Sequence, residues 1–124
     1  MSRWSILIVD DDEAICFSLK YALEKNGFEV VTIDNGLDGI RQIMEKDFDL
    51  VILDLNLGGM TGVDVLKSVN LENRNTKILI HSSYDKSFSL HKDAMRLGGH
   101  DSLPKPCSPK ELLEKINSLL PTEA

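Results

Sequence analysis

The chain has 124 residues, of which 42% are hydrophobic and 27% charged, a composition typical of one globular domain with its own core. A net charge of −6 at pH 7 disfavours direct binding to nucleic acid or to an anionic membrane, and it favours cations. The two cysteines lack zinc-ligand spacing, and the sequence shows neither a signal peptide nor a membrane-length apolar run, so we expect a cytoplasmic protein with reduced thiols.

Five short apolar segments alternate with five segments of helical period. The apolar segments predict strands at residues 4–9, 28–33, 49–55, 77–82 and 100–104. Three of them, WSILIV, DLVILDL and KILIHS, are continuously apolar, which is typical of parallel strands buried on both faces. The alternation predicts an α/β fold, a doubly wound (βα)5 parallel sheet with helices on both faces.

Apolar faces and end signals predict the helices between these strands. Gly27 closes the first helix and residues 98–99 close the fourth, which spans about 86–97. The last helix begins at SPKE, with Ser108 as N-cap and Glu111 completing a capping box. The expected buried faces of the first, second, third and fifth helices are, in order, Ile15, Leu19, Ala22 and Leu23; Leu37, Ile40 and Met44; Val63, Leu66 and Val69; and Leu112, Ile116, Leu119 and Leu120.

Polar side chains follow four of the strands, at the rim where doubly wound sheets bind ligands. They are Asp10, Asp11 and Asp12 after the first strand, Asp54 at the third, Ser82 at the fourth and Lys105 after the fifth. Each of these residue types alone is common in turns, helix caps or loops. Their occurrence together at four strand ends is what indicates a ligand site. Two carboxylates about 4 Å apart repel by roughly 4 kcal/mol at an effective dielectric near 20, and a divalent cation such as Mg²⁺ would reverse that repulsion. An aspartate beside a cation can also attack a phosphoryl group, with an ammonium and a hydroxyl orienting its oxygens.

Four stretches, ILIVDDDEAI, DLVILDLNLGGMTG, KILIHSS and LPKP, resemble the receiver domain of bacterial two-component response regulators in order and spacing. The resemblance covers essentially the whole chain, so we expect one domain over 1–124 with 121–124 as a tail or the start of a linker. It implies a flavodoxin-like sheet with strand order 2-1-3-4-5. It also implies a signalling protein, not an enzyme with an external substrate: a sensor histidine kinase or phosphotransfer protein passes a phosphoryl group to Asp54 in a Mg²⁺-dependent reaction.

The resemblance also implies a ligand set for the metal. Asp11, Asp54 and the backbone carbonyl of Asn56 are expected to bind Mg²⁺ directly, and Asp10 is expected to bind it through water. Asp12 lies one residue too far along the chain and is expected to cap the first helix.

The remaining roles implied by the resemblance concern switching. Ser82 corresponds to the switch hydroxyl of receivers. Lys105 corresponds to the lysine that the family has after the fifth strand, whose bond to the following proline is usually cis. Asn56 and Tyr84 occupy positions that tune dephosphorylation. Phosphorylation is then expected to change a surface around residues 84–120, which would control a downstream protein, an output domain or a second copy of the chain.

Four positions depart from the commonest receiver pattern: Gly58 replaces a proline, Ser82 a threonine with the hydroxyl kept, Ser102 an aromatic residue and Cys107 a phenylalanine. All the site residues of the pattern are present. The aromatic residues that couple the site to the output surface in receivers are missing. The alternative is therefore a receiver-fold interaction module that acts independently of phosphorylation. Asn56, where an aspartyl phosphatase usually has a second acid, disfavours that enzyme class, and the absence of a phosphate loop after the first strand disfavours a flavin protein.

The three histidines, His81, His91 and His100, have no ligand spacing, so we do not expect a metal or phosphohistidine site from them. The chain ends in LLPTEA soon after the last expected helix. The sequence is compatible both with a stand-alone receiver and with a piece of a longer regulator or hybrid kinase.

Overall fold

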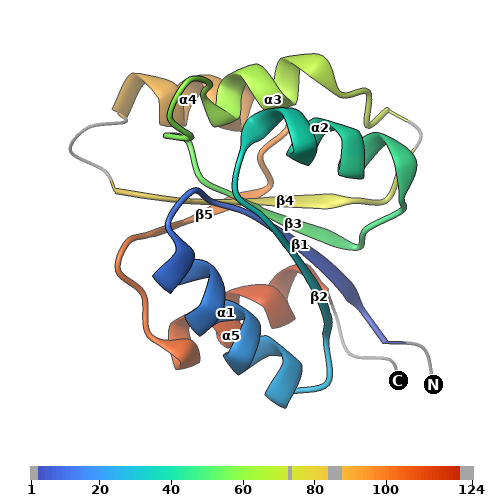
Figure 1. Cartoon of the computed structure of the whole chain (residues 1–124), viewed down its shortest axis with the longest axis vertical. Helices are drawn as coiled ribbons and strands as arrows, with labels where there is room; N and C mark the ends of the chain where they lie inside the picture. The colour runs from blue at the N-terminus through green and yellow to red at the C-terminus, as the bar shows by residue number, and fades with distance from the viewer. Residues whose placement is uncertain (1–2, 73, 84–87, 121–124) are drawn as a thin grey trace.

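The structure is a computed structural model that describes residues 3–72, 74–83 and 88–120. Strands and helices alternate along this part of the chain, from β1 to α5 (Figure 1). The strands are β1 (Ser5–Val9), β2 (Glu29–Ile33), β3 (Leu50–Leu53), β4 (Lys77–Ser82) and β5 (Asp101–Pro104). The helices are α1 (Glu13–Lys25), α2 (Gly36–Glu45), α3 (Gly62–Ser68), α4 (Phe88–Arg96) and α5 (Pro109–Leu119).

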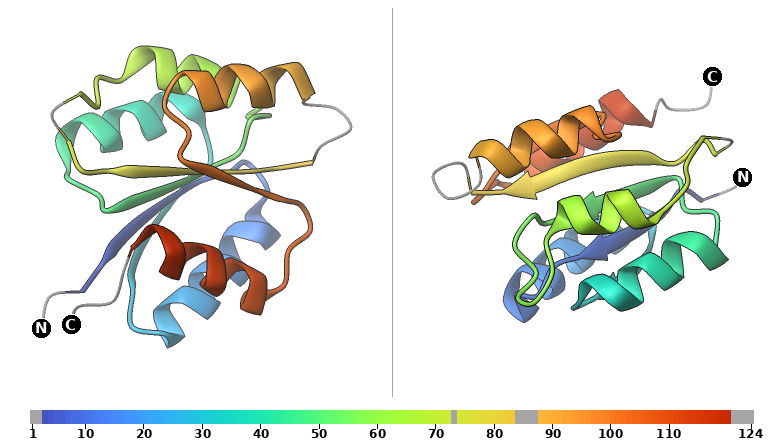
Figure 2. Two further views of the ribbon diagram at one scale, coloured as in Figure 1. Left: turned by 180° about the vertical axis from the view of Figure 1, so that it is seen from behind. Right: turned by 90° about the horizontal axis from the view of Figure 1, so that it is seen from above.

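The strands form one parallel sheet, as the alternation predicts, in the order β2-β1-β3-β4-β5 that the family resemblance implies. Helices α1 and α5 cover one face, and α2, α3 and α4 cover the other (Figures 1 and 2). Val9, the last residue of β1, pairs with Ile33 of β2 and with Leu53 of β3. This register brings the carboxyl ends of the three strands to the same level of one edge.

The central strands are buried on both faces, which explains their continuously apolar sequences. Alternate side chains of β1 and β3 point to opposite sides, so Val9 and Leu53 join the core beneath α2, α3 and α4. Ile8 and Ile52 join the second core, beneath α1 and α5. The third strand, Leu50–Leu53, is shorter than the expected 49–55.

The predicted helix ends are largely confirmed. Asp12 is the N-cap of α1, and its side chain accepts hydrogen bonds from the backbone N–H groups of Ala14 and Ile15. Gly27 follows the C-cap of α1 with φ of +90°, a left-handed conformation that favours glycine. Ser108 and Glu111 form the expected capping box at the start of α5.

The expected buried face of α2 is confirmed at Ile40, which packs against the core, and is wrong at Leu37 and Met44. Leu37 and Met44 are 67% and 43% exposed, whereas Gly36, Gly39 and Ile43 are buried. Gly39 faces the sheet, and α2 packs so close there that a Cβ would lie 3.0 Å from Val9 Cγ1, whereas Gly36 faces the side chain of Met60. A count of large apolar side chains cannot detect a face made of glycine. Within the described residues, no helix is both long and apolar enough to span a membrane.

Candidate functional site

Two aspartates lie side by side at the carboxyl edge of the sheet because their strands are neighbours. The backbone N–H of Asp10 donates to the carbonyl of Ile33 at 3.0 Å, and that of Asp54 donates to the carbonyl of Val9 at 3.0 Å. Both residues therefore continue the ladder just beyond β1 and β3. Their side chains are almost completely buried, with 2% of Asp10 and 5% of Asp54 exposed.

Three carboxylates meet at this edge. Asp10, Asp11 and Asp54 each offer an oxygen, and the three oxygens lie within 4.8 Å of one another. Asp11 is exposed, so the cluster is open to solvent on one side. Carboxylate oxygens on a partly open site are the ligands that Mg²⁺ prefers in proteins, and the residues present therefore fit this cation.

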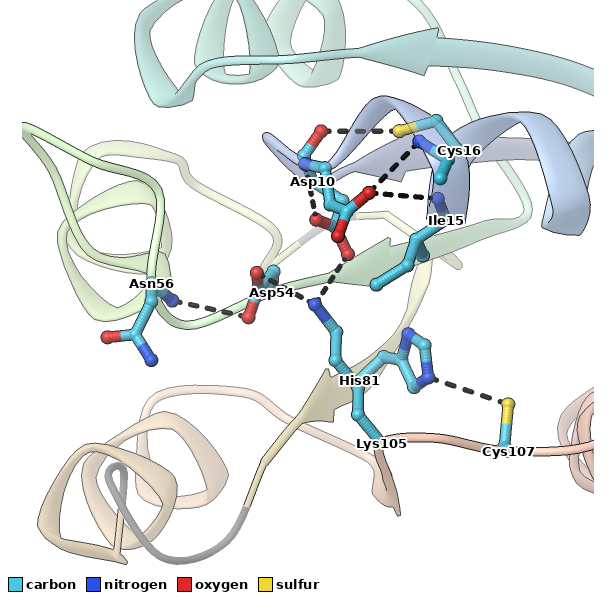
Figure 3. A network of polar contacts seen from close by, with 10 residues as sticks. Asp10, Ile15, Cys16, Asp54, Asn56, His81, Lys105 and Cys107 are labelled. Atoms are coloured by element: carbon cyan, nitrogen blue, oxygen red, sulfur yellow. Dashed lines mark hydrogen bonds and ion pairs between the residues drawn. The ribbon is translucent and has the colours of Figure 1, made fainter.

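One lysine connects the two buried carboxylates (Figure 3). The Nζ atom of Lys105 lies 2.9 Å from Asp10 Oδ2 and 3.0 Å from Asp54 Oδ2. Burial alone would lower the pKa of Lys105, but hydrogen bonds to the two carboxylates outweigh it and raise that pKa. Its backbone N–H donates to the carbonyl of Ser82 at 3.1 Å, and its bond to Pro106 is cis, as expected.

The cluster as a whole keeps an excess of negative charge. Burial raises the pKa of Asp10 even though Lys105 and the backbone N–H of Asp12 donate hydrogen bonds to it, and the nearby Asp54 raises it further. With all three carboxylates ionised, charges of −3 from the acids and +1 from the lysine leave −2. A bound cation would reduce that excess.

The other expected site residues are placed as follows. Ser82 is the last residue of β4 and is buried at the same edge, where it pairs with Pro104 of β5. Asn56 is exposed, and its backbone N–H donates to Asp54 Oδ1 at 3.3 Å. Tyr84 lies outside the described residues. The structure thus brings Ser82 and Asn56 to the edge that holds the three carboxylates and Lys105.

The loop after Asp54 contains contributors that the sequence analysis missed. The backbone N–H of Leu57 donates to the carbonyl of Met60 at 3.0 Å, which closes a turn. Thr61 then caps α3 in a capping box with Asp64. The next residue, Gly62, lies so close to Asp54 that a Cβ there would collide with the Asp54 backbone carbonyl. The sequence TGVD at residues 61–64 could have indicated both features, since it contains a helix-capping residue followed by a glycine.

A buried histidine lies on the other side of Lys105 (Figure 3). His81 is 3% exposed, and burial together with the positive charge of Lys105 lowers its pKa to about 4, so the imidazole is neutral at pH 7. Its Nε2 lies 3.5 Å from Cys107 Sγ. The sequence pattern around His81 predicts only that this histidine belongs to neither a metal site nor a phosphohistidine site.

Comparison with known proteins identifies the family. The family model described as "Response regulator receiver domain" matches residues 6–117. The chain belongs to the response regulator receiver domain family. The receiver fold is equally evident in solved structures: the CheY-like receiver domain protein of Methanospirillum hungatei JF-1 superposes with a TM-score of 0.88 at 34% identity, covering 96% of this chain and 94% of that one. CheY4 of Vibrio cholerae gives 0.85 at 27% identity, covering 95% and 99%.

Curated relatives of this receiver domain are larger regulators. The transcriptional regulatory protein PhoP for alkaline phosphatase synthesis in Bacillus subtilis is 31% identical over 115 residues, which are 93% of this chain and 48% of that protein. The alginate biosynthesis transcriptional regulatory protein AlgB of Pseudomonas aeruginosa is 37% identical over 110 residues, 86% of this chain and 24% of that protein. The chain therefore spans at most about half of these two relatives.

Proposed function

We propose that this receiver domain accepts a phosphoryl group on Asp54 from the phosphohistidine of a sensor kinase or phosphotransfer protein in the cytoplasm. The observation that supports the proposal is the pairing of a buried aspartate, Asp54, with one ammonium at 3.0 Å and with two further carboxylates within 4.8 Å. No other site in the described residues combines a nucleophile, a cation and a set of metal ligands in this way.

The carboxylates of Asp10, Asp11 and Asp54 would hold Mg²⁺, together with the backbone carbonyl of Asn56. A bound Mg²⁺ would supply positive charge that offsets the negative charge of the phosphoryl oxygens beside Asp54. Asp10 is the most deeply buried of the three acids and already accepts a hydrogen bond from Lys105. We therefore assign it the outer, water-mediated position.

The transfer itself exchanges one bond to phosphorus for another. A carboxylate oxygen of Asp54 attacks the phosphorus, a P–O bond forms and the P–N bond of the donor breaks. The electron pair of that P–N bond returns to the donor imidazole, which then takes a proton from solvent. Lys105, 3.0 Å from Asp54 Oδ2, is placed to exchange its contact with the carboxylate for one with a phosphoryl oxygen.

Phosphorylation of Asp54 would change the surface around β4 and β5 through Ser82. A phosphoryl oxygen on Asp54 would attract the Ser82 hydroxyl and the Lys105 ammonium, which lie at the ends of β4 and β5. Such a contact favours one arrangement of a two-state surface over the other. We assign that surface to α4, β5 and α5, and its recipient to a downstream protein, an output domain or a second copy of the chain. We assign to Asn56 and Tyr84 the role of tuning the rate at which the phosphoryl group is lost.

The experiment is phosphorylation by a small phosphodonor in the presence of Mg²⁺, followed by intact mass spectrometry. We expect the wild type to gain the mass of one phosphoryl group, the gain to be lost in Asp54→Asn, and the gain to require Mg²⁺. Asp12→Asn is the matched control, since Asp12 is an exposed helix cap and asparagine caps equally well. A gain that persists in Asp54→Asn would overturn the assignment.

Partner binding distinguishes this function from that of a phosphorylation-independent interaction module. Ser102 lies on β5, where the aromatic residue common in receivers is missing, and this is the observation that favours the module. Affinity for a downstream partner should change on phosphorylation if Asp54 is the switch. An affinity that is the same for both forms would favour the module.

A further inference from the structure

The loop that follows β3 is a closed turn with two glycines at its tip. Asn56 and Thr61 pair as an antiparallel bridge, which forms the base of the turn. Above this bridge, the backbone N–H of Leu57 donates to the carbonyl of the residue three positions later, at 3.0 Å. The two residues enclosed by this hydrogen bond are Gly58 and Gly59, so their backbone angles determine how the loop closes.

The first of the two glycines has a backbone conformation that other residues seldom adopt. Gly58 has φ of +75°, whereas the φ of Gly59 is not positive. A positive φ disfavours every L-amino acid that carries a Cβ, and it excludes proline, whose ring fixes φ at about −65°. The residue that is commonest at this position in receivers could therefore not form the turn that this chain has.

Gly58 faces the acid cluster, and its neighbour does not. A Cβ built on Gly58 would lie 4.0 Å from Asp11 Oδ2, which is ordinary van der Waals contact. An alanine at this position would therefore introduce backbone strain without a collision. Around a Cβ built on Gly59, no heavy atom of the described residues beyond its chain neighbours lies within 4 Å. The two glycines thus differ in φ and in what they face, although they share one turn.

The turn is anchored on both sides of its tip, so moving the whole loop cannot relieve strain there. Leu57 is 5% exposed and belongs to the core beneath α2, α3 and α4, and Met60 packs against the same core. The peptide groups left to rotate are those on either side of Leu57, and one of them carries the carbonyl of Asn56. The backbone N–H of Asn56 in turn donates to Asp54 Oδ1 at 3.3 Å (Figure 3). A change of φ at Gly58 therefore acts on Asn56.

We propose that Gly58 is a positioning residue for the metal, because its left-handed backbone holds the Asn56 peptide in the orientation that Mg²⁺ requires. The inference rests on the proposed function, in which the Asn56 carbonyl is a Mg²⁺ ligand. A residue that favours negative φ at this position relaxes the empty loop into another conformation. Binding of Mg²⁺ must then restore the strained turn, and the cost of that strain weakens the affinity.

The test compares alanine substitutions at the two adjacent glycines. Gly58→Ala and Gly59→Ala add the same methyl group to the same turn, but only Gly58→Ala places it on a backbone of positive φ. Mg²⁺ is titrated into the isotope-labelled full chain at constant ionic strength, and its Kd is measured from the NMR shifts of the amides. We expect Gly58→Ala to bind Mg²⁺ about fivefold to thirtyfold more weakly than the wild type. Gly59→Ala should bind it within about twofold of the wild type.

A second substitution separates strain from the presence of a side chain. Asparagine adopts positive φ more readily than alanine does, so Gly58→Asn should bind Mg²⁺ more tightly than Gly58→Ala although its side chain is larger. It also replaces Gly58→Ala in the comparison with the wild type if circular dichroism shows that the alanine variant does not fold. A residue with only a structural role would change the urea midpoint without Mg²⁺ and leave the Kd of the folded protein unchanged.

Two results would overturn the inference alone. Equal Mg²⁺ affinity of the wild type and of a folded Gly58→Ala would show that the turn is not coupled to the metal, and would leave phosphoryl transfer to Asp54 intact. An equal loss of affinity in Gly59→Ala would show that lost flexibility, and not φ, is the cause. An absence of saturable Mg²⁺ binding to the wild type would overturn the proposed function and this inference together.

Discussion

Replacing His81 by leucine is expected to reduce the loss of stability that acid causes in this protein. Burial lowers the pKa of His81 to about 4, whereas the same group in an unfolded chain titrates near 6.5. The unfolded chain therefore takes up this proton at a higher pH than the folded chain. Stability is lost as the pH falls through about 6.5, and the loss is complete near pH 4.

The size of the effect follows from the two pKa values. Between pH 7 and pH 5, proton linkage at His81 should lower the free energy of unfolding by about 2 kcal/mol, and over the whole range by about 3 kcal/mol. Asp10 acts in the opposite direction, since burial raises its pKa and the folded chain binds that proton more tightly. The comparison of wild type with variant removes this contribution, because Asp10 is present in both.

The assay is urea unfolding of the wild type and of His81→Leu at pH 7 and at pH 5. At pH 7 the two should agree within about 1 kcal/mol, because leucine has a similar volume and lacks the ring nitrogen, Nδ1, that has no hydrogen-bond partner among the described residues. At pH 5 the variant should be more stable by about 2 kcal/mol relative to that baseline. Cys107→Ala is the matched control, since it removes the 3.5 Å contact but keeps the imidazole and should keep the full pH dependence.

An equal fall in stability for the wild type and for His81→Leu would refute the reasoning. It would mean that the folded protein accommodates the protonated imidazole as easily as water does.

Three further outcomes concern the acid cluster and its loop. Lys105→Met leaves the buried Asp10 and Asp54 without their cation, so it should reduce the free energy of unfolding by about 3 to 5 kcal/mol in urea, and by less when Mg²⁺ is added. Mg²⁺ should raise the urea midpoint of the wild type more than that of Asp11→Asn; an equal rise would place the ion elsewhere. Thr61→Ala removes the N-cap of α3 and should cost about 1 kcal/mol in thermal unfolding, whereas an unchanged melting temperature would show that the cap is redundant.

Element order and the position of the acid cluster could be predicted because they depend on local signals. Continuously apolar segments specify strands buried on both faces, and the polar residue that follows each one marks the end of the strand. Parallel topology then brings Asp10 and Asp54 to one edge, although 44 positions separate them. Caps such as Ser108 were equally readable, since a capping box depends on side chains three residues apart.

The buried face of α2 could not be predicted, because it depends on the distance between packed elements. Gly39 faces Val9 so closely that a Cβ would lie 3.0 Å from Val9 Cγ1, a very tight contact. Gly62 makes a similar approach to the backbone of Asp54. A pattern of apolar residues does not contain interaxial distances, so it assigned Leu37 and Met44 to the core, whereas both are exposed.

The sequence by itself determined which elements form, in what order, and which chemistry gathers at the carboxyl edge, because propensity, period and strand termination are encoded by neighbouring residues. Only the tertiary structure decided that Lys105 joins Asp10 to Asp54, and that His81 meets Cys107 beside a cavity. Burial and electrostatic environment arise from all the elements packed around a group. The same imidazole that would titrate near 6.5 in water is therefore neutral here down to about pH 4.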